Sequence, residues 1–259
     1  MSREFIKLGD NVMAVFEDES EFIFTVDGKQ IGTHKGIIKT EELVDKPFGG
    51  TFHTHTGQKF VALRPRFVDE IYHMKRKTQI VYPKDMGFIL LMLDVKEGDK
   101  VIDAGVGSGA MCAALARAVG SCGKVFAYEK REEFLKLAEE NLRKWGLLDR
   151  VVLKLKDISE GFDEVVDAIF LDVPDPWNYI RQCYDSLIGS GNLAIVCPTT
   201  NQVQQVVDEL QKNGFFQIEI WESLFRQYKT NPERLRPFDR MVAHTAYMIF
   251  ARKKYFKEV

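Results

Sequence analysis

The chain has 259 residues, of which 45% are hydrophobic and 29% are charged, and its formal net charge is −2. This length suits one large domain, or one large domain with a small module, and the composition is that of an ordinary globular protein. No apolar stretch reaches membrane-spanning length, residues 1–5 lack the hydrophobic segment of a signal peptide, and the near-neutral charge does not by itself indicate nucleic-acid binding.

The cysteines and histidines do not indicate a metal site. None of the cysteines forms a C-x-x-C pair, so neither a zinc site nor a disulfide framework is expected, and reduced thiols in a cytoplasmic protein are predicted. His53 and His55 lie on one face of an expected strand, but no third ligand has suitable spacing. We therefore expect no metal.

Residues 1–66 are predicted to form a small antiparallel β domain, either a compact barrel or a meander. Residues 21–26 alternate in the manner of a strand, and Asp27-Gly28 follows them as a strong hairpin signal. Several glycines separate further short strands: Gly32, Gly36, Gly49, Gly50 and Gly57.

Residues 67–259 have a different pattern, in which helices and strands alternate. We expect Asp85 to cap an apolar helix, since Pro83 stops any strand before it. The helices are expected at 67–72, 86–93, 132–145 and 203–210, and a last strand at 245–251. Such alternation predicts a parallel sheet with helices on both faces.

The sequence VIDAGVGSGA at 101–110 is the most informative segment, because it has the order strand, glycine-rich turn and helix. Glycine has no Cβ, so the turn lets the backbone approach a ligand closely, and the helix N-terminus offers unpaired N–H groups. Gly105, Gly107 and Ala110 also match the dinucleotide-binding fingerprint. The segment predicts a nucleotide-like ligand, which NAD would also satisfy.

Four strands in this part of the chain each end in an acidic residue: Asp103, Glu129, Asp157 and Asp172. Ligands of open α/β sheets bind at the carboxyl ends of the strands, so these residues outline one elongated site. Asp103 is suited to order the loop and to meet a cationic amino-acid group. The series favours S-adenosylmethionine over NAD, and the alternative is that the acids cap helices.

Several of these motifs together resemble the tRNA adenine-N1 methyltransferases that modify the T-loop adenosine at position 58. They are TQIVYPKD at 78–85, the loop 103–110, Tyr128-Glu129, Asp157, LDVPDPW at 171–177, Arg236-Pro237 and HTA at 244–246. The resemblance covers nearly the whole chain and implies a Rossmann-like class I methyltransferase sheet with a small N-terminal β domain. Val196 and Cys197 depart from the pattern, because some family members have a tyrosine just before the following proline.

The resemblance implies an S-adenosylmethionine site in which Glu129 holds the ribose hydroxyls. Asp157 would meet the adenine amine beside the backbone of Ile158, and Phe134 would either flank the adenine or pack in the core. The full expected set is Gln79, Ile80, Asp103, Gly105, Gly107, Ser108, Gly109, Ala110, Met111, Glu129, Phe134, Asp157, Ile158 and Asp172.

The catalytic prediction follows from the chemistry of the acceptor. Adenine N1 has a free lone pair once the base is unpaired, so no strong base is needed, but positive charge grows on the ring as the methyl arrives. A carboxylate beside the base edge would stabilise that charge, and Asp172 is our candidate. Tyr82 would stack on the base or close the cofactor pocket, with a buried structural tyrosine as the alternative.

The expected partner is tRNA, whose target base must be extruded before it can react. The basic residues expected on the RNA backbone are Lys75, Arg76 and Lys77 in one stretch, and Arg226, Lys229, Arg234, Arg236 and Arg240 in another. The alternative for both stretches is a solvated loop. The resemblance further implies a homotetramer, or a heteromer with a related noncatalytic subunit.

Three other functions compete with this interpretation. A protein L-isoaspartyl methyltransferase shares a Gln- and Pro-containing segment before a similar loop. An NAD-dependent oxidoreductase would share the glycine fingerprint. A noncatalytic tRNA-binding subunit would be expected to lack the glycine loop or Asp172, and both are present. Whether adenosine 57 is also a target stays open.

Overall fold

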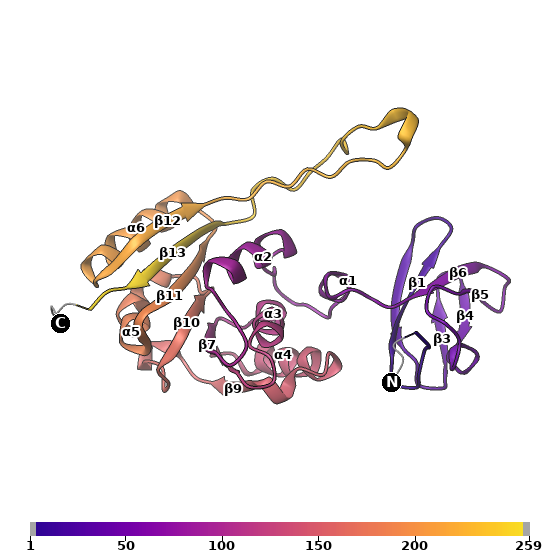
Figure 1. The fold of residues 1–259 in the computed structure, drawn as a ribbon, viewed down its shortest axis with the longest axis horizontal. Coiled ribbons are helices and arrows are strands. Elements are labelled where there is room, and N and C mark those ends of the chain that lie inside the picture. The colour runs from indigo at the N-terminus through magenta and orange to yellow at the C-terminus, as the bar shows by residue number, and fades with distance from the viewer. Residues whose placement is uncertain (1–3, 256–259) are drawn as a thin grey trace. The chain divides into compact units, whose positions relative to one another are not determined.

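The computed structural model describes residues 4–255, which divide into two compact units between Met74 and Lys75 (Figure 1). Helix α1 (Phe67–Tyr72) belongs to the first unit, because Asn11 donates to Glu70 at 3.2 Å and His73 lies 3.8 Å from Glu21. The expected division into independent domains after residue 66 stays a prediction.

The first unit contains a small antiparallel sheet, as expected. Its order is β2-β1-β6-β5, and β3 and β4 form a separate two-stranded ladder. Phe16, Phe24 and Phe60 are buried in its core. The bounds are β1 (Asn11–Phe16), β2 (Glu21–Thr25), β3 (Gln30–Thr33), β4 (Gly36–Lys39), η1 (Thr40–Leu43), β5 (Thr51–His53) and β6 (Lys59–Leu63).

The hairpin predicted at Asp27-Gly28 is wrong. A turn does form, with Gly28 at φ 79° and the Asp27 carboxylate accepting the Lys29 amide at 3.0 Å. The strands on either side nevertheless enter different ladders, since β2 pairs with β1 and β3 pairs with β4. Val26 explains the difference: it is buried and its amide donates to Asp10 at 2.9 Å, which keeps it beside β1 rather than β3.

The second unit is built on a seven-stranded sheet of order β12-β13-β11-β10-β7-β8-β9. Neighbouring strands from β11 to β9 are parallel, and β13 is antiparallel to both of its neighbours. The bounds are β7 (Lys100–Ala104), β8 (Lys124–Glu129), β9 (Val151–Leu155), β10 (Val166–Leu171), β11 (Leu187–Cys197), β12 (Phe215–Trp221) and β13 (Tyr247–Lys253).

Helices cover both faces of this sheet, which confirms the predicted Rossmann-like architecture. Helices α5 and α6 lie on one side, and α2, α3 and α4 on the other (Figure 1). The bounds are α2 (Pro83–Met92), α3 (Ala110–Ala118), α4 (Glu132–Lys144), η2 (Leu148–Arg150), η3 (Ile158–Glu160), η4 (Pro176–Tyr179), α5 (Ile180–Ser186), α6 (Thr200–Lys212) and η5 (Pro232–Arg234). No helix among residues 4–255 is long and apolar enough to cross a membrane.

Helix α2 begins at Pro83, whereas the sequence pattern predicts a start at Met86 with Asp85 as the cap. Tyr82 is the residue in the cap position, and Pro83 occupies the first helical position. Proline is tolerated there because the first helical N–H has no intrahelical partner. Asp85 therefore lies inside the first turn, where it makes contacts described below.

Residues 222–246, here called the arm, connect β12 to β13 and extend away from the sheet (Figure 1). Its two sides are joined by backbone hydrogen bonds from Lys229 to Arg236 at 2.8 Å and from Phe238 to Gln227 at 3.0 Å. Many of its large apolar side chains are exposed: Leu224, Phe225, Tyr228, Leu235, Phe238, Met241 and Val242.

Candidate functional site

The four predicted acids lie on four neighbouring strands. In the order of the sheet they are Asp172 after β10, Asp103 in β7, Glu129 at the end of β8 and Asp157 after β9. These strands are parallel, so their carboxyl ends share one edge, here called the acid edge. Strand β7 has β8 on one side and β10 on the other, so the order of the strands reverses its direction at β7. The acid edge therefore lies at a topological switch point.

The glycine loop between β7 and α3 is shaped by its nearness to Asp172. Gly105 has φ 92°, and a Cβ built there would lie 1.9 Å from the Asp172 backbone oxygen. Only glycine permits both this conformation and this approach. The buried Asn141 fixes the other end of the loop, since its side-chain amide donates to the carbonyls of Ser108 and Lys75, each at 2.9 Å.

Three cavities lie along the acid edge. The glycine-loop cavity has a volume of about 290 Å³, and the predicted residues that line it are Gln79, Ile80, Gly105, Gly107, Ser108, Ala110, Met111 and Asp172. The Glu129 cavity has a volume of about 160 Å³ and is lined by Gly105, Glu129, Asp157, Ile158 and Asp172 among others.

The Tyr82 cavity, of about 200 Å³, lies on the opposite side of Asp172 from the strand that carries Glu129. Gln79, Ile80, Tyr82 and Asp172 are the predicted residues that line it. Asp172 is thus common to all three cavities. Asp103, Gly109 and Phe134 line none of these three: Asp103 is buried in β7, and Gly109 precedes α3.

Glu129 is buried and already engaged by its neighbours. Its Oε2 accepts the Gly107 amide at 3.2 Å, and its Oε1 accepts the backbone amide and the Nε of Arg131, each at 3.1 Å. The Arg131 guanidinium also covers the ring of Phe134, with 3.8 Å to the centroid. Phe134 is buried beneath Arg131, and its contact with a bound adenine stays a prediction.

Burial changes the protonation of two of the acids. Burial raises the pKa of Asp103 to about 8, and the carboxylates of Asp172 and Glu129 add to the effect, while the Cys112 thiol partly opposes it. Asp172 forms a wall of the cavities and is exposed to them, yet surrounding protein excludes much of the bulk water and raises its pKa to about 6. Asp157 behaves oppositely, because the Ser159 amide lowers its pKa.

Two buried side chains in the site lack hydrogen-bond partners among the described residues. They are Ser108, through its hydroxyl, and Asp103, whose carboxylate oxygens have no hydrogen bond of good geometry although the Cys112 thiol, a weak donor, lies near enough to lower its pKa. Buried polar groups in folded proteins are nearly always paired, so unpaired ones in a cleft indicate a place for a ligand. Ser108 lines the glycine-loop cavity and Asp103 is buried in β7, so the placement of a ligand's cationic end at Asp103 stays a prediction.

The predicted RNA-binding residues lie on two segments, one before α2 and one in the arm. Lys75 and Lys77 are exposed and form ion pairs with Glu140 at 3.6 Å and with Glu133 at 3.1 Å. The arginines of the arm are exposed: Arg226, Arg234, Arg236 and Arg240. Lys229 instead pairs with Asp239 at 2.9 Å.

Sequence reasoning missed several residues of the site. Arg131 lines both the glycine-loop and Glu129 cavities, and Gln202 joins α6 to the loop after β10 by donating to the Pro174 carbonyl at 3.1 Å. Pro198 lines two cavities and directly follows β11. Pro198 could have been predicted, because ligands of open α/β sheets bind at the carboxyl ends of the strands. No local sequence pattern indicates Arg131 or Gln202.

A comparison with protein families matches residues 70–236 to the family described as "tRNA methyltransferase complex GCD14 subunit". A curated relative from Methanocaldococcus jannaschii, named tRNA (adenine(57)-N(1)/adenine(58)-N(1))-methyltransferase TrmI, is 31% identical over 93% of this chain and 94% of its own length.

Two solved structures cover almost the whole chain. A protein from Thermotoga maritima, described as a SAM-dependent O-methyltransferase, is 62% identical with a TM-score of 0.93, over 99% of this chain and 97% of that one. The tRNA (m1A58) methyltransferase TrmI from Aquifex aeolicus is 35% identical with a TM-score of 0.84, over 97% and 99%. The match over more than half of the chain and these full-length similarities show that the chain belongs to the family of the tRNA methyltransferase complex GCD14 subunit.

Proposed function

We propose that this protein transfers a methyl group from S-adenosylmethionine to N1 of adenosine 58 in the T-loop of tRNA. The observation that carries the proposal is the position of Asp172, which lies where the cavities of the acid edge meet the Tyr82 cavity. One carboxylate can there face both a bound cofactor and an acceptor base. The names of the Methanocaldococcus and Aquifex relatives support the choice of acceptor.

The residues of the acid edge fit S-adenosylmethionine, which supplies an electrophilic methyl group on a sulfonium. The Ser108 hydroxyl is unpaired among the described residues and lines the glycine-loop cavity, so it suits the amino-acid end, and a cationic ammonium bound there would favour the ionised form of Asp103. Glu129 suits the ribose hydroxyls, and Asp157 with Ile158 suits the adenine. Arg131 must release one oxygen of Glu129 for this role, because it now donates to Oε1.

Asp172 acts on the acceptor through its charge. With a pKa of about 6 it is mainly a carboxylate at neutral pH. It can accept a hydrogen bond from the exocyclic amine of adenine and stabilise positive charge on the ring, which is electrostatic preorganisation. Tyr82 lines the same cavity and is placed to contact the base. Oriented reactants and exclusion of water supply the rest.

Methylation of a hydroxyl is the second candidate, because the Thermotoga relative is described as an O-methyltransferase. A hydroxyl acceptor must lose its proton as it reacts, and an aliphatic hydroxyl requires a strong base. Asp172, with a pKa of about 6, is too weak a base for that task. Adenine N1 carries no proton, so the same carboxylate is sufficient.

The arm supports the proposals for tRNA and for oligomer formation. Its arginines are exposed and can contact phosphates, while its exposed apolar side chains are of the kind that another subunit covers. We propose that the protein acts as a homotetramer in the cytoplasm, where the unpaired cysteines of the described chain would stay reduced.

The proposal is tested by incubating the protein with labelled S-adenosylmethionine and three acceptors: unmodified tRNA, an isoaspartyl peptide and a small phenol. Label in tRNA alone is the expected result. Efficient labelling of the peptide would support protein repair, and labelling of the phenol would support O-methylation.

A further inference from the structure

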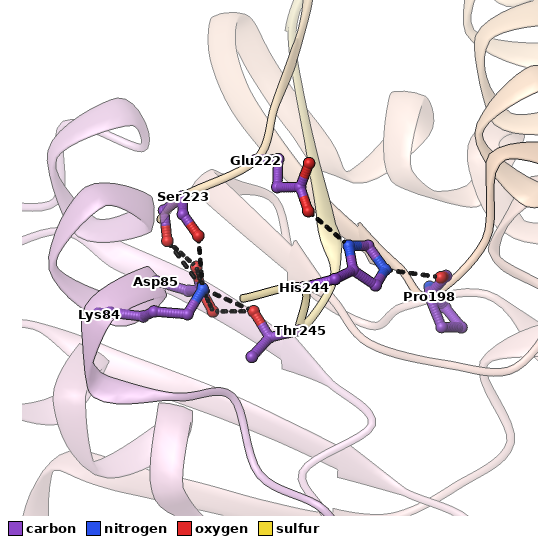
Figure 2. Close-up of polar contacts among 7 residues, drawn as sticks. All are labelled: Lys84, Asp85, Pro198, Glu222, Ser223, His244 and Thr245. Carbon is purple, nitrogen blue, oxygen red and sulfur yellow. Dashed lines mark hydrogen bonds and ion pairs between the residues drawn. The ribbon is translucent and has the colours of Figure 1, made fainter. Parts of the chain in front are cut away.

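The arm joins the sheet through four residues, here called the stem: Glu222 and Ser223 after β12, and His244 and Thr245 before β13. Successive side chains of an extended chain point to opposite sides. Figure 2 shows the consequence, since Ser223 and Thr245 face Lys84 and Asp85, whereas Glu222 and His244 lie together with Pro198. The stem is therefore held by hydrogen bonds on both of its sides.

On the first side, the Asp85 carboxylate receives four hydrogen bonds. Lys84 Nζ donates to Oδ1 at 2.9 Å and to Oδ2 at 3.1 Å, the Ser223 hydroxyl donates to Oδ1 at 2.6 Å, and the Thr245 hydroxyl donates to Oδ2 at 2.8 Å. An ionised carboxylate offers about four lone-pair sites. Asp85 is saturated by protein groups.

Lys84 is equally occupied. Its ammonium also donates to the Ser223 carbonyl at 2.9 Å and to the Thr245 hydroxyl at 2.7 Å. Only 13% of the Lys84 side chain and 3% of the Asp85 side chain are exposed. A buried ion pair adds little net stability, but loss of one partner is strongly unfavourable, so the pair fixes geometry.

On the second side, the His244 ring bridges two acceptors. Its Nδ1 lies 2.7 Å from Oε1 of Glu222, and its Nε2 lies 3.0 Å from the Pro198 carbonyl oxygen (Figure 2). A ring that donates to both must be protonated on both nitrogens. The Pro198 carbonyl and the Glu222 carboxylate accordingly raise the pKa of His244, while Lys84 opposes the shift.

The hydrogen bonds on both sides of the stem involve residues that line the Tyr82 cavity. Asp85, Thr245 and Pro198 line it together with Tyr82 and Asp172. We infer that Lys84, Asp85 and His244 are positioning residues that hold the two walls of this cavity at a fixed separation and couple the cavity to the arm. The role of the cavity as the acceptor site rests on the proposed function. Asp85 and Lys84 act through other groups, because their hydrogen-bonding capacity is already used.

The decisive variants are Thr245→Val and Thr245→Ser. Valine has the shape of threonine but cannot donate to Asp85, whereas serine keeps the hydroxyl. Asp85→Asn and His244→Phe break the two sides separately. The matched control is Glu132→Gln, which removes an exposed carboxylate from its pair with Lys136 at 2.6 Å on α4. Each variant is compared with the wild-type enzyme for cofactor affinity, melting temperature, and KM and kcat with tRNA.

We expect kcat/KM for tRNA to fall roughly tenfold to a hundredfold in Thr245→Val, Asp85→Asn and His244→Phe, as misplacement of reactants does. Cofactor affinity should change by less than about twofold, and Thr245→Ser and Glu132→Gln should resemble the wild type. If Thr245→Val keeps wild-type kcat/KM, or if Thr245→Ser is as defective as Thr245→Val, the inference is overturned. A wild-type enzyme that methylates no tRNA would instead contradict the proposed function itself.

Discussion

The acid edge and the arm belong to the same compact unit but are stabilised in opposite ways. At the edge, Asp103 and Glu129 are buried by neighbouring parallel strands and by the glycine loop. In the arm, large side chains such as Phe225 and Leu235 are 64% and 69% exposed. The side chains of the edge are thus packed within the fold, whereas the large apolar side chains of the arm are exposed in this chain. We propose from this contrast that the chemistry takes place at the edge and that the arm serves assembly and RNA binding.

The largest effect should come from Asp172 at the edge. Asp172→Asn should retain cofactor binding but lose about two to three orders of magnitude in single-turnover methyl transfer, similar to the loss of one oxyanion-hole donor. Calorimetry with S-adenosylmethionine checks the first part. A near-normal rate in Asp172→Asn would show that the carboxylate charge is not required.

A smaller effect is expected at Glu129, which belongs to the cofactor half of the edge. Glu129→Ala should weaken S-adenosylmethionine binding by about 1.5–3 kcal/mol, roughly 10- to 150-fold, because the variant has no carboxylate to accept hydrogen bonds from the ribose hydroxyls. Glu132→Ala, at an exposed carboxylate on α4, serves as the control in the same titration. If the two variants bind S-adenosylmethionine equally well, Glu129 does not contact the ribose.

The pH dependence of the rate should also come from the edge. In the proposed role Asp172 acts as a carboxylate, and because its pKa is raised to about 6, that form is lost as the pH falls through this value. At low concentrations of cofactor and tRNA, kcat/KM, which reports the pKa of the free enzyme, should fall about tenfold per pH unit below about 6 and be level above it. An unchanged pH profile in Asp172→Asn would assign the titration to another group.

The arm should affect RNA affinity without affecting the cofactor. Alanine substitution of Arg226, Arg234, Arg236 or Arg240 should reduce the slope of log affinity against log salt by up to about one unit for each phosphate-binding arginine that is removed. Arg181→Ala on α5, where the arginine pairs with Asp185 at 2.8 Å, is the control. Unaltered slopes in all four variants would leave the arm as an assembly element only.

A last effect, on stability rather than on activity, concerns the cofactor-free edge. The pKa of Asp103 is raised from 3.8 to about 8, so between these values the folded state holds a proton that the unfolded state has released. Stability should therefore fall as the pH rises from about 4 to about 8, by at most about 1.4 kcal/mol per pH unit from this group. Denaturant melts should show a shallower dependence on pH in Asp103→Asn; an identical dependence contradicts the assignment.

The edge could be predicted from the sequence because its signals are local. Each acid directly follows an apolar strand, and parallel pairing brings the strand ends together. The predictions that were wrong involved competition between distant segments: Val26 stays beside β1 despite the turn signal at Asp27-Gly28, and Pro83 starts α2 instead of preceding it. Arg131 was missed because its place between Glu129 and Phe134 depends on packing alone.

The arm was the least predictable region for the same reason. Its exposed apolar residues do not alternate toward a core of this chain, and hydrogen bonds at its base join Lys84 to Ser223 and Thr245, which lie 139 and 161 positions away. No local pattern encodes such contacts. The functions of Asp172 and Tyr82, in contrast, were proposed from the motifs, and the structure brings the two side chains to one cavity, where their roles stay predictions.

The central claim, that the acid edge delivers a methyl group to an unprotonated ring nitrogen, is tested most directly by mapping the modified nucleoside. An unmodified tRNA transcript is incubated with the wild-type protein and labelled S-adenosylmethionine, digested, and analysed by mass spectrometry against N1-methyladenosine and 2′-O-methyladenosine standards. The account predicts N1-methyladenosine at position 58 and its near-absence with Asp172→Asn. Label on a ribose hydroxyl, or an equal yield from Asp172→Asn, would contradict it.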